Sequence, residues 1–323
     1  MYIRPLDHSA QDSALKAFVT GGAGFIGSNL VRRLLQNGDS VTVFDNFSSG
    51  KESNLPKSDR LLLVRNDVLD LVALKHAMVG HDIVFHLSTN PDTARGLRET
   101  DLDLHQGTIA TYNVLESMRV NNVKRIVFPS GSGVYGEVGD RIIAEDFGPL
   151  LPISMYGATK LASEAMISCF SHAFGMRGFI LRLGNVVGNR LTHGVIFDFI
   201  QKLKENPATL TVLGDGNQTK PYIHVDDVID AMFLVLEKAK DQVNVFNVAT
   251  DDWPTVTWIA QTVIDEMGLK DTKIEYAGGD RGWKGDVPII KLDTSKIKKL
   301  GWRSRYNSKE AIRRAIRATL AEN

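Results

Sequence analysis

Residues 20–30 read TGGAGFIGSNL, and three of their glycines, Gly21, Gly24 and Gly27, are spaced three residues apart. The apolar run AFVT at 17–20 leads into this stretch, and SNLVRRLLQNG, with apolar residues at helical spacing, follows it. Glycines at such a junction allow a tight turn and bring backbone N–H groups and a helix N-terminus up to a pyrophosphate. The order strand, glycines, helix therefore predicts the first unit of a dinucleotide-binding α/β domain.

The same alternation of strand and helix patterns continues through the first two thirds of the chain. Short runs rich in Val, Ile, Leu and Phe, typical of parallel strands buried on both faces, recur at AFVT (17–20), SVTVFD (40–45), LLLVRND (61–67), IVFHLS (83–88), RIVFPS (125–130) and FILRLG (179–184). We therefore expect an α/β fold, a doubly wound parallel sheet with a second, smaller α/β lobe. Residues 15–183 should form the dinucleotide-binding domain, with 222–248 returning to it, and 184–221 and 249–323 the second lobe.

The overall composition excludes several classes of protein. The chain has 38 Lys and Arg residues and 38 Asp and Glu residues, so no net field would attract nucleic acid or a membrane, and neither is expected as a partner. The polar start MYIRPLDHSAQDS is unlike a signal peptide, so residues 1–14 are interpreted as an extension and the protein is expected in the cytoplasm. Cys169, the single cysteine, is expected in the core. No His, Asp and Glu cluster has metal-ligand spacing, so no metal is expected.

An acidic residue ends the second predicted strand. The carboxylate of Asp45 would accept hydrogen bonds from the adenosine ribose and repel a 2′-phosphate, and no arginine follows it in DNFSSG. NAD is therefore expected rather than NADP. Asp67, after the third strand, is placed to reach the adenine, although aspartates in such places also cap helices.

Tyr156 and Lys160 lie four residues apart in SMYGATKLASEA, so the start of a predicted helix presents both on one face. An ammonium group near a phenol favours the phenolate and lowers the tyrosine pKa from about 10, and a positively charged nicotinamide would add to this effect. The pair is expected to abstract a proton. Alone, it would more often be an ordinary packed surface, and the cofactor motif favours the chemical interpretation.

These motifs, in this order, resemble the extended short-chain dehydrogenase/reductases, and among them the NAD-dependent nucleotide-sugar epimerases and dehydratases. The resemblance covers residues 15–303 and includes TGGAGFIGSNLV, DNFSSG, FHLS, GTIATYNVLE, VYGE, YGATK, LRLGNVVG, LGDGNQTKPYIHVDD and GDVP. It implies that Tyr156 takes the proton of a sugar C4 hydroxyl, that Lys160 holds the nicotinamide ribose, and that the second lobe binds a nucleotide sugar. It also implies a homodimer formed through helices near 106–120 and 156–174.

The stretch SGSGVYG departs from the family pattern. The family's serine or threonine lies four residues before the tyrosine of this element, Tyr135, and that position is Gly131 here. Ser132 could swing into the vacated place, because the glycines leave the backbone free, and it is counted as a predicted catalytic residue. Ser130 or a water could fill the place instead, and a strand-end turn without a catalytic hydroxyl is a further alternative.

The same stretch helps to choose the reaction. Family dehydratases carry Asp and Glu where this chain has Ser132 and Gly133, and the family decarboxylases keep a glutamate at the second position. Dehydration and decarboxylation are therefore disfavoured, and 4-epimerisation through a transient 4-keto sugar is expected, with UDP-sugars favoured. A 4-dehydrogenase or ketoreductase, a dehydratase, and a non-catalytic NAD-binding regulatory protein remain as alternatives.

The resemblance also implies substrate contacts. Asn185 would lie near the diphosphate, although a loop asparagine often bonds its own backbone. Lys220 stands where relatives commonly hold a diphosphate-gripping arginine, and Arg281 is a further candidate, although Trp283 occupies the place of the relatives' second arginine. The predicted substrate-binding residues are Asn90, Ser132, Asn185, Lys220 and Arg281. The predicted cofactor-binding residues are Gly21, Gly24, Phe25, Ile26, Gly27, Asp45, Asn46, Ser48, Ser49, Gly50, Asp67, Val68, Leu87, Ser88, Thr89, Ser130, Tyr156, Lys160 and Val186. His86 and His224 are expected to be structural.

Overall fold

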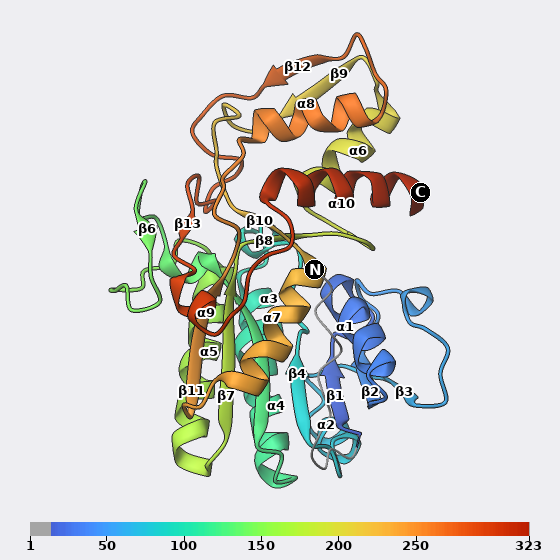
Figure 1. Cartoon of the computed structure of the whole chain (residues 1–323), viewed down its shortest axis with the longest axis vertical. Coiled ribbons are helices and arrows are strands. Elements are labelled where there is room, and N and C mark those ends of the chain that lie inside the picture. The colour runs from blue at the N-terminus through green and yellow to red at the C-terminus, as the bar shows by residue number, and fades with distance from the viewer. Residues whose placement is uncertain (1–13, 323) are drawn as a thin grey trace.

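The computed structural model describes residues 14–322 and has a seven-stranded parallel sheet at its centre (Figure 1). The strand order is β11-β7-β5-β4-β1-β2-β3. The strands are β1 (Lys16–Thr20), β2 (Ser40–Asp45), β3 (Leu61–Arg65), β4 (Ile83–His86), β5 (Arg125–Gly131), β7 (Arg177–Leu183) and β11 (Val243–Val248). The predicted doubly wound α/β fold is confirmed. The chain reverses its direction of travel across the sheet between β1 and β4, which is where such folds bind ligands.

Helices cover both faces of this sheet. One face carries α1 (Phe25–Gln36) and α7 (Val225–Lys238), and the other carries α2 (Leu71–Ala77), α4 (Ala110–Val120) and α5 (Met155–Phe174). Successive strand residues point to opposite faces. In β1, Val19 therefore packs into the core under α1, whereas Phe18 packs into the core under α4.

The helical stretch that ends in α4 begins earlier than the sequence indicated. A helix was expected near 106–120, and the structure has α3 (Thr100–Asp103), a π-helical segment (Leu104–Ile109) and then α4. In α5 the sequence explains both ends, because the Ser154 side chain accepts a hydrogen bond from the Gly157 N–H and Gly175 ends the helix with a left-handed conformation.

The smaller lobe lies at one end of the sheet (Figure 1). It contains α6 (Val195–Glu205), α8 (Val256–Glu266) and α10 (Ser308–Glu322), with the parallel pair β9 (Thr209–Val212) and β12 (Lys273–Tyr276). Further elements are the parallel pairs β8 (Asn185–Val187) with β10 (Tyr222–His224) and β6 (Ile142–Ile143) with β13 (Lys291–Leu292), helix α9 (Ser295–Lys299), and short 3-10 turns at Glu52–Asn54, Arg95–Leu97 and Ser132–Tyr135.

Three expectations from the sequence need correction. Cys169 is exposed on α5 and is not buried in the core, because the buried face of the helix contains Ile167 and Cys169 lies on the other side. The strand at 61–65 is not buried on both faces, since it is the edge strand of the sheet and Leu62 is 60% exposed. The sequence named six strands, whereas β11 adds a seventh beside β7.

Some expectations concern what the chain lacks. Within residues 14–322, no helix is both long and apolar enough to cross a membrane. In the same part of the chain, no group of three or more His, Cys, Asp and Glu side chains could hold a metal ion. The predicted extension, apart from residue 14, lies outside the described residues. The cytoplasmic location stays a prediction.

Candidate active site

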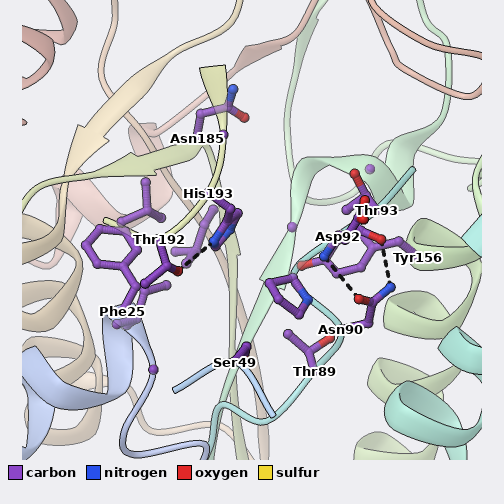
Figure 2. Close-up of a pocket in the computed structure, with 18 of the residues that line it drawn as sticks. Phe25, Ser49, Thr89, Asn90, Asp92, Thr93, Tyr156, Asn185, Thr192 and His193 are labelled. Atoms are coloured by element: carbon purple, nitrogen blue, oxygen red, sulfur yellow. Dashed lines mark hydrogen bonds between the residues drawn. The ribbon is translucent and has the colours of Figure 1, made fainter. Parts of the chain in front are cut away.

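A cavity of about 890 Å³ lies at the carboxyl ends of the central strands, between the sheet and the smaller lobe. Figure 2 shows Phe25, Thr192 and His193 on one side of it, and Asn90 and Tyr156 on the other. Its lining comes from the glycine-rich turn after β1, the ends of β2, β4 and β5, the start of α5, and lobe segments around 183–199, 213–222 and 282–290. A single cavity therefore joins most of the motifs that the sequence singled out.

The glycine-rich turn is packed too tightly for side chains. Gly21 has φ +66°, and a Cβ there would lie 2.7 Å from the backbone nitrogen of Ser88. A Cβ on Gly27 would lie 2.2 Å from the carbonyl oxygen of Gly21. Gly24 is the N-cap residue of helix α1 and offers no side-chain cap, and Gly24 and Phe25 line the cavity. The first-turn N–H groups of a helix lack intrahelical partners and attract anions, so the turn fits a pyrophosphate.

Asp45 ends β2 at the edge of this cavity and is 8% exposed. Its carboxylate accepts hydrogen bonds from the backbone N–H groups of Ala23 at 2.9 Å and Phe47 at 2.8 Å. Each oxygen keeps a further lone pair, so the group can still accept from a ribose hydroxyl. This arrangement fits the adenosine end of NAD.

The other predicted cofactor residues divide into two sets. Those that line the cavity with the turn and Asp45 are Ile26, Asn46, Ser48, Ser49, Val68, Leu87, Ser88, Thr89, Ser130 and Val186. Gly50 and Asp67 do not line it. Gly50 packs against Ala23, and the Asp67 carboxylate accepts hydrogen bonds from the Asn46 side chain at 2.7 Å and the Leu69 N–H at 2.9 Å.

Tyr156 and Lys160 both line the cavity, one helical turn apart at the start of α5. The Lys160 ammonium donates to the carbonyl oxygen of Pro129 at 2.9 Å and lies 5.5 Å from the centre of the Tyr156 ring. Burial lowers the pKa of Lys160 to about 8. The helix thus presents both side chains on one face.

The expected depression of the Tyr156 pKa is not a property of the side chains alone. Burial, with a smaller contribution from the negative charge of Asp103, raises the pKa of Tyr156 to about 12. The reason is that the phenol is removed from water, whereas the ammonium of Lys160 is directed to a backbone carbonyl. A useful phenolate therefore needs further positive charge in the cavity.

Position 131 faces the tyrosine. A Cβ on Gly131 would lie 3.9 Å from Cε1 of Tyr156, at ordinary van der Waals distance, and apart from its chain neighbours no other atom of the described residues would be within 4 Å. Ser130 is 3% exposed and its hydroxyl has no hydrogen-bond partner among the described residues, while Ser132 begins a 3-10 turn. Both serines line the cavity. The place beside Tyr156 is thus open to a larger residue.

The predicted substrate residues do not all reach the cavity. Asn90, Asn185 and Lys220 line it, and Lys220 is ion-paired with Asp286. Arg281 does not line it, because its guanidinium is engaged with Glu137 and Asp280. The two histidines are structural, as expected. His86 bonds the hydroxyls of Thr20 and Thr111, burial lowers its pKa to about 3, and the His224 ring caps α7.

Several lining residues were missed from the sequence. Asp92 and Thr93 follow β4, and the rule that ligands bind at the carboxyl ends of parallel strands could have identified them. His193 and Lys202 line the cavity from the segment that leads into α6 and from α6 itself. No sequence motif singled out these two residues.

Comparisons with known proteins agree with this geometry. Residues 17–249 match the model of the NAD dependent epimerase/dehydratase family. The UDP-glucose 4-epimerase of Mycolicibacterium smegmatis is 29% identical over 94% of this chain and 97% of its own length. A crystal structure of a UDP-galactose 4-epimerase is 36% identical with a TM-score of 0.86, covering 95% of this chain and 99% of its own. The UDP-glucose 4-epimerase of Thermotoga maritima with UDP-glucose is 31% identical with a TM-score of 0.87, covering 95% and 99%.

Proposed function

The chain belongs to the NAD-dependent epimerase/dehydratase family, and from that premise we propose that it is a nucleoside-diphosphate-sugar 4-epimerase that favours UDP-sugars. The observation that carries the proposal is the placement of Tyr156 and Lys160 in the same cavity as the glycine-rich turn and the smaller lobe. The proposal is tested by incubating the protein with UDP-glucose and detecting inversion at C4 by NMR.

We assign each part of NAD to residues whose chemistry fits it. The N-terminus of α1 would hold the pyrophosphate, Asp45 the adenosine ribose and Lys160 the nicotinamide ribose. When bound, NAD would supply a hydride acceptor and donor for sugar C4, and its oxidised ring would bring positive charge into the cavity. We propose that residues 15–183 with 222–248 form the NAD-binding domain, and that 184–221 and 249–323 bind the nucleotide sugar.

Tyr156 is assigned the proton transfer. Its phenolate takes the proton of the C4 hydroxyl as the 4-keto sugar forms. After the sugar has turned, so that hydride would return to the opposite face of C4, the phenol gives the proton back to the C4 oxygen. Positive charge in the cavity would lower the pKa of the phenol, which burial raises to about 12 in the chain itself. Ser132 and Gly133 line the cavity where an eliminating acid and base would be needed, so dehydration is disfavoured.

The diphosphate is assigned to the lobe. Lys220, Lys202, Asn185 and the start of α6 at Val195 line that end of the cavity. Because Asp286 pairs with Lys220, part of the charge that would meet a diphosphate is already neutralised. The helix N-terminus, which attracts anions through its unpaired N–H groups, then contributes more of the binding.

Restoring a hydroxyl at position 131 should raise activity. The backbone at Gly131 is extended, and a Cβ there would meet only the Tyr156 ring at 3.9 Å, so a serine fits. We expect Gly131→Ser to raise kcat on the order of tenfold, since a hydroxyl beside the phenol can relay the proton. Gly131→Ala adds the methylene carbon without the hydroxyl and should leave kcat within about twofold of the parent. Equal kcat values for the two variants would contradict the claim that a hydroxyl at position 131 relays the proton.

We also propose a homodimer through the helices near 106–120 and 156–174. Large apolar side chains remain exposed along these helices, including Ile109, Tyr112 and Phe174. Light scattering should give twice the mass of one chain, and Tyr112→Glu should shift the protein towards the single-chain mass. A parent protein that is monomeric at micromolar concentration would contradict the dimer.

A further inference from the structure

A buried carboxyl group lies behind the candidate base, and the proposed reaction does not use it. Asp103 ends α3 and is 2% exposed. One carboxylate oxygen accepts a hydrogen bond from the Asn90 side chain at 2.9 Å. The other, Oδ2, is buried and has no hydrogen-bond partner among the described residues. Leaving a buried acceptor unpaired costs about 1–3 kcal/mol, more for a charged group, so its retention calls for an explanation.

The carboxyl group lies against Gly96, and Gly96 lies close to the start of α5. A Cβ on Gly96, in the turn after the β4 loop, would lie 2.2 Å from Oδ2 of Asp103 and 3.4 Å from Cβ of Met155. Met155 immediately precedes Tyr156 in α5. Asp103 is therefore held where the loop after β4 packs against the start of the catalytic helix.

Asp103 also organises that loop through Asn90. The Asn90 side chain donates to the carbonyl oxygen of Asp92 at 2.8 Å as well as to Asp103, and it accepts from the Asp92 N–H at 3.0 Å. Asn90 and Asp92 line the cavity beside Tyr156, as Figure 2 shows. The three hydrogen bonds thus tie a stretch of cavity wall to the buried carboxyl group.

The charge of Asp103 is only partly compensated, by the ammonium of Lys160. From α5, Tyr156 and Lys160 face it, and the Lys160 ammonium is bonded to a backbone carbonyl. Asp92 faces it from the loop with the same sign of charge. On its own helix Asp101 is exposed, and in the neighbouring turn the charge of Arg95 is paired with Glu99.

The electrostatic consequence has a definite sign. Burial, more than any other cause, raises the pKa of Asp103 itself, and the hydrogen bond from Asn90 opposes this. When the carboxyl group is ionised, its negative charge adds to burial in raising the pKa of Tyr156. A neutral group at this place would leave burial alone to oppose the phenolate.

We propose that Asp103 is a positioning residue of the epimerase site, which holds the cavity wall at Asn90 and Asp92 beside Tyr156. A consequence is that its buried negative charge opposes ionisation of the phenol. This inference rests on the proposed function. A phenol with a raised pKa holds its proton more tightly, so the negative charge of Asp103 opposes the deprotonation that begins the oxidation. The carboxylate keeps the base dependent on positive charge brought into the cavity.

Asp103→Asn tests the charge with little change of shape, because the amide can still accept the hydrogen bond from Asn90. The pH titration of tyrosinate absorbance is recorded for the parent and for Asp103→Asn, each with and without Tyr156→Phe. Subtracting the curve with Tyr156→Phe from the curve without it isolates the titration midpoint of Tyr156. We expect Asp103→Asn to move that midpoint down by at least about half a pH unit, a roughly threefold change in the ionisation constant. The acidic limb of kcat/KM should move in the same direction, so that the variant gains activity at low pH.

Asp101→Asn is the matched control, since it removes an exposed carboxylate from the same helix and should leave the midpoint unchanged. If Asp103→Asn fails to fold, Asp103→Ser removes the same charge and keeps an acceptor. A midpoint that stays or rises in the neutral variant overturns the inference. The titration needs no turnover, so loss of C4 epimerisation in the parent would contradict the proposed function without affecting this result.

Discussion

Replacing Tyr156 with phenylalanine should lower kcat for C4 epimerisation by about 10³-fold or more. The phenol is the only group proposed to take the C4 proton, and general acid–base catalysis typically contributes 10²–10⁴-fold. The phenylalanine ring keeps the packing against Lys160, whose ammonium lies 5.5 Å from the ring centre. Initial rates at saturating substrate, with NAD content measured in the same preparation, check the prediction.

The control is the same change at an exposed tyrosine of α4. Tyr112→Phe also removes one hydroxyl but lies outside the cavity, so kcat should stay within about twofold of the parent. If Tyr156→Phe retained a tenth of the activity, another residue would have to be the base. If the parent bound NAD but turned over no nucleotide sugar, the missing hydroxyl at Gly131 would instead favour a non-catalytic NAD-binding protein.

Replacing Gly27 with alanine should abolish stable NAD binding. The added methyl group would lie 2.2 Å from the Gly21 carbonyl oxygen and 2.8 Å from Cα of Gly22, and neither backbone atom can rotate away. The first turn of α1 must therefore move away from the glycine-rich turn at Gly21 and Gly22. We expect NAD affinity to fall by about 100-fold or more, and the free energy of unfolding to fall by about 1–3 kcal/mol. Calorimetric titration with NAD and urea unfolding measure the two effects.

Gly24→Ala is the graded control in the same turn. Its methyl group would meet the Gly21 carbonyl oxygen at 3.3 Å, so a shift of a few tenths of an ångström relieves the contact. We expect a loss of affinity at least tenfold smaller than for Gly27→Ala. Parent-like affinity in Gly27→Ala would show that the close packing of helix on loop is not what forms the pyrophosphate site.

The fold could be predicted because its signals are local in the sequence. Continuous apolar runs and the glycine turn identified β1, β2, β3, β4, β5 and β7 and the point where the dinucleotide would bind. Strand β11 was missed because VNVFNV contains two asparagines, Asn244 and Asn247, whose buried side chains are satisfied by hydrogen bonds to distant residues. Such partners cannot be seen from spacing alone.

The site could be predicted only in part, for the same reason. Asp45, Tyr156 and Lys160 belong to contiguous motifs, and the structure places all three on one cavity. The direction of the Tyr156 pKa shift was wrong for the chain itself, because burial and the charge of a residue on another helix decide it. Arg281, near GDVP, was a further candidate for the diphosphate, whereas its guanidinium is engaged with carboxylates outside the cavity.

The central claim is that Tyr156 and Lys160 serve a reversible oxidation at C4 with NAD held in place throughout. The most direct test uses UDP-glucose that carries deuterium at C4, with the product examined by NMR. The account predicts UDP-galactose with the deuterium still at C4, because the hydride equivalent that leaves C4 returns to C4 without exchange with solvent. Loss of the label to solvent, accumulation of a keto or dehydrated sugar, or the absence of any C4 epimer would contradict it.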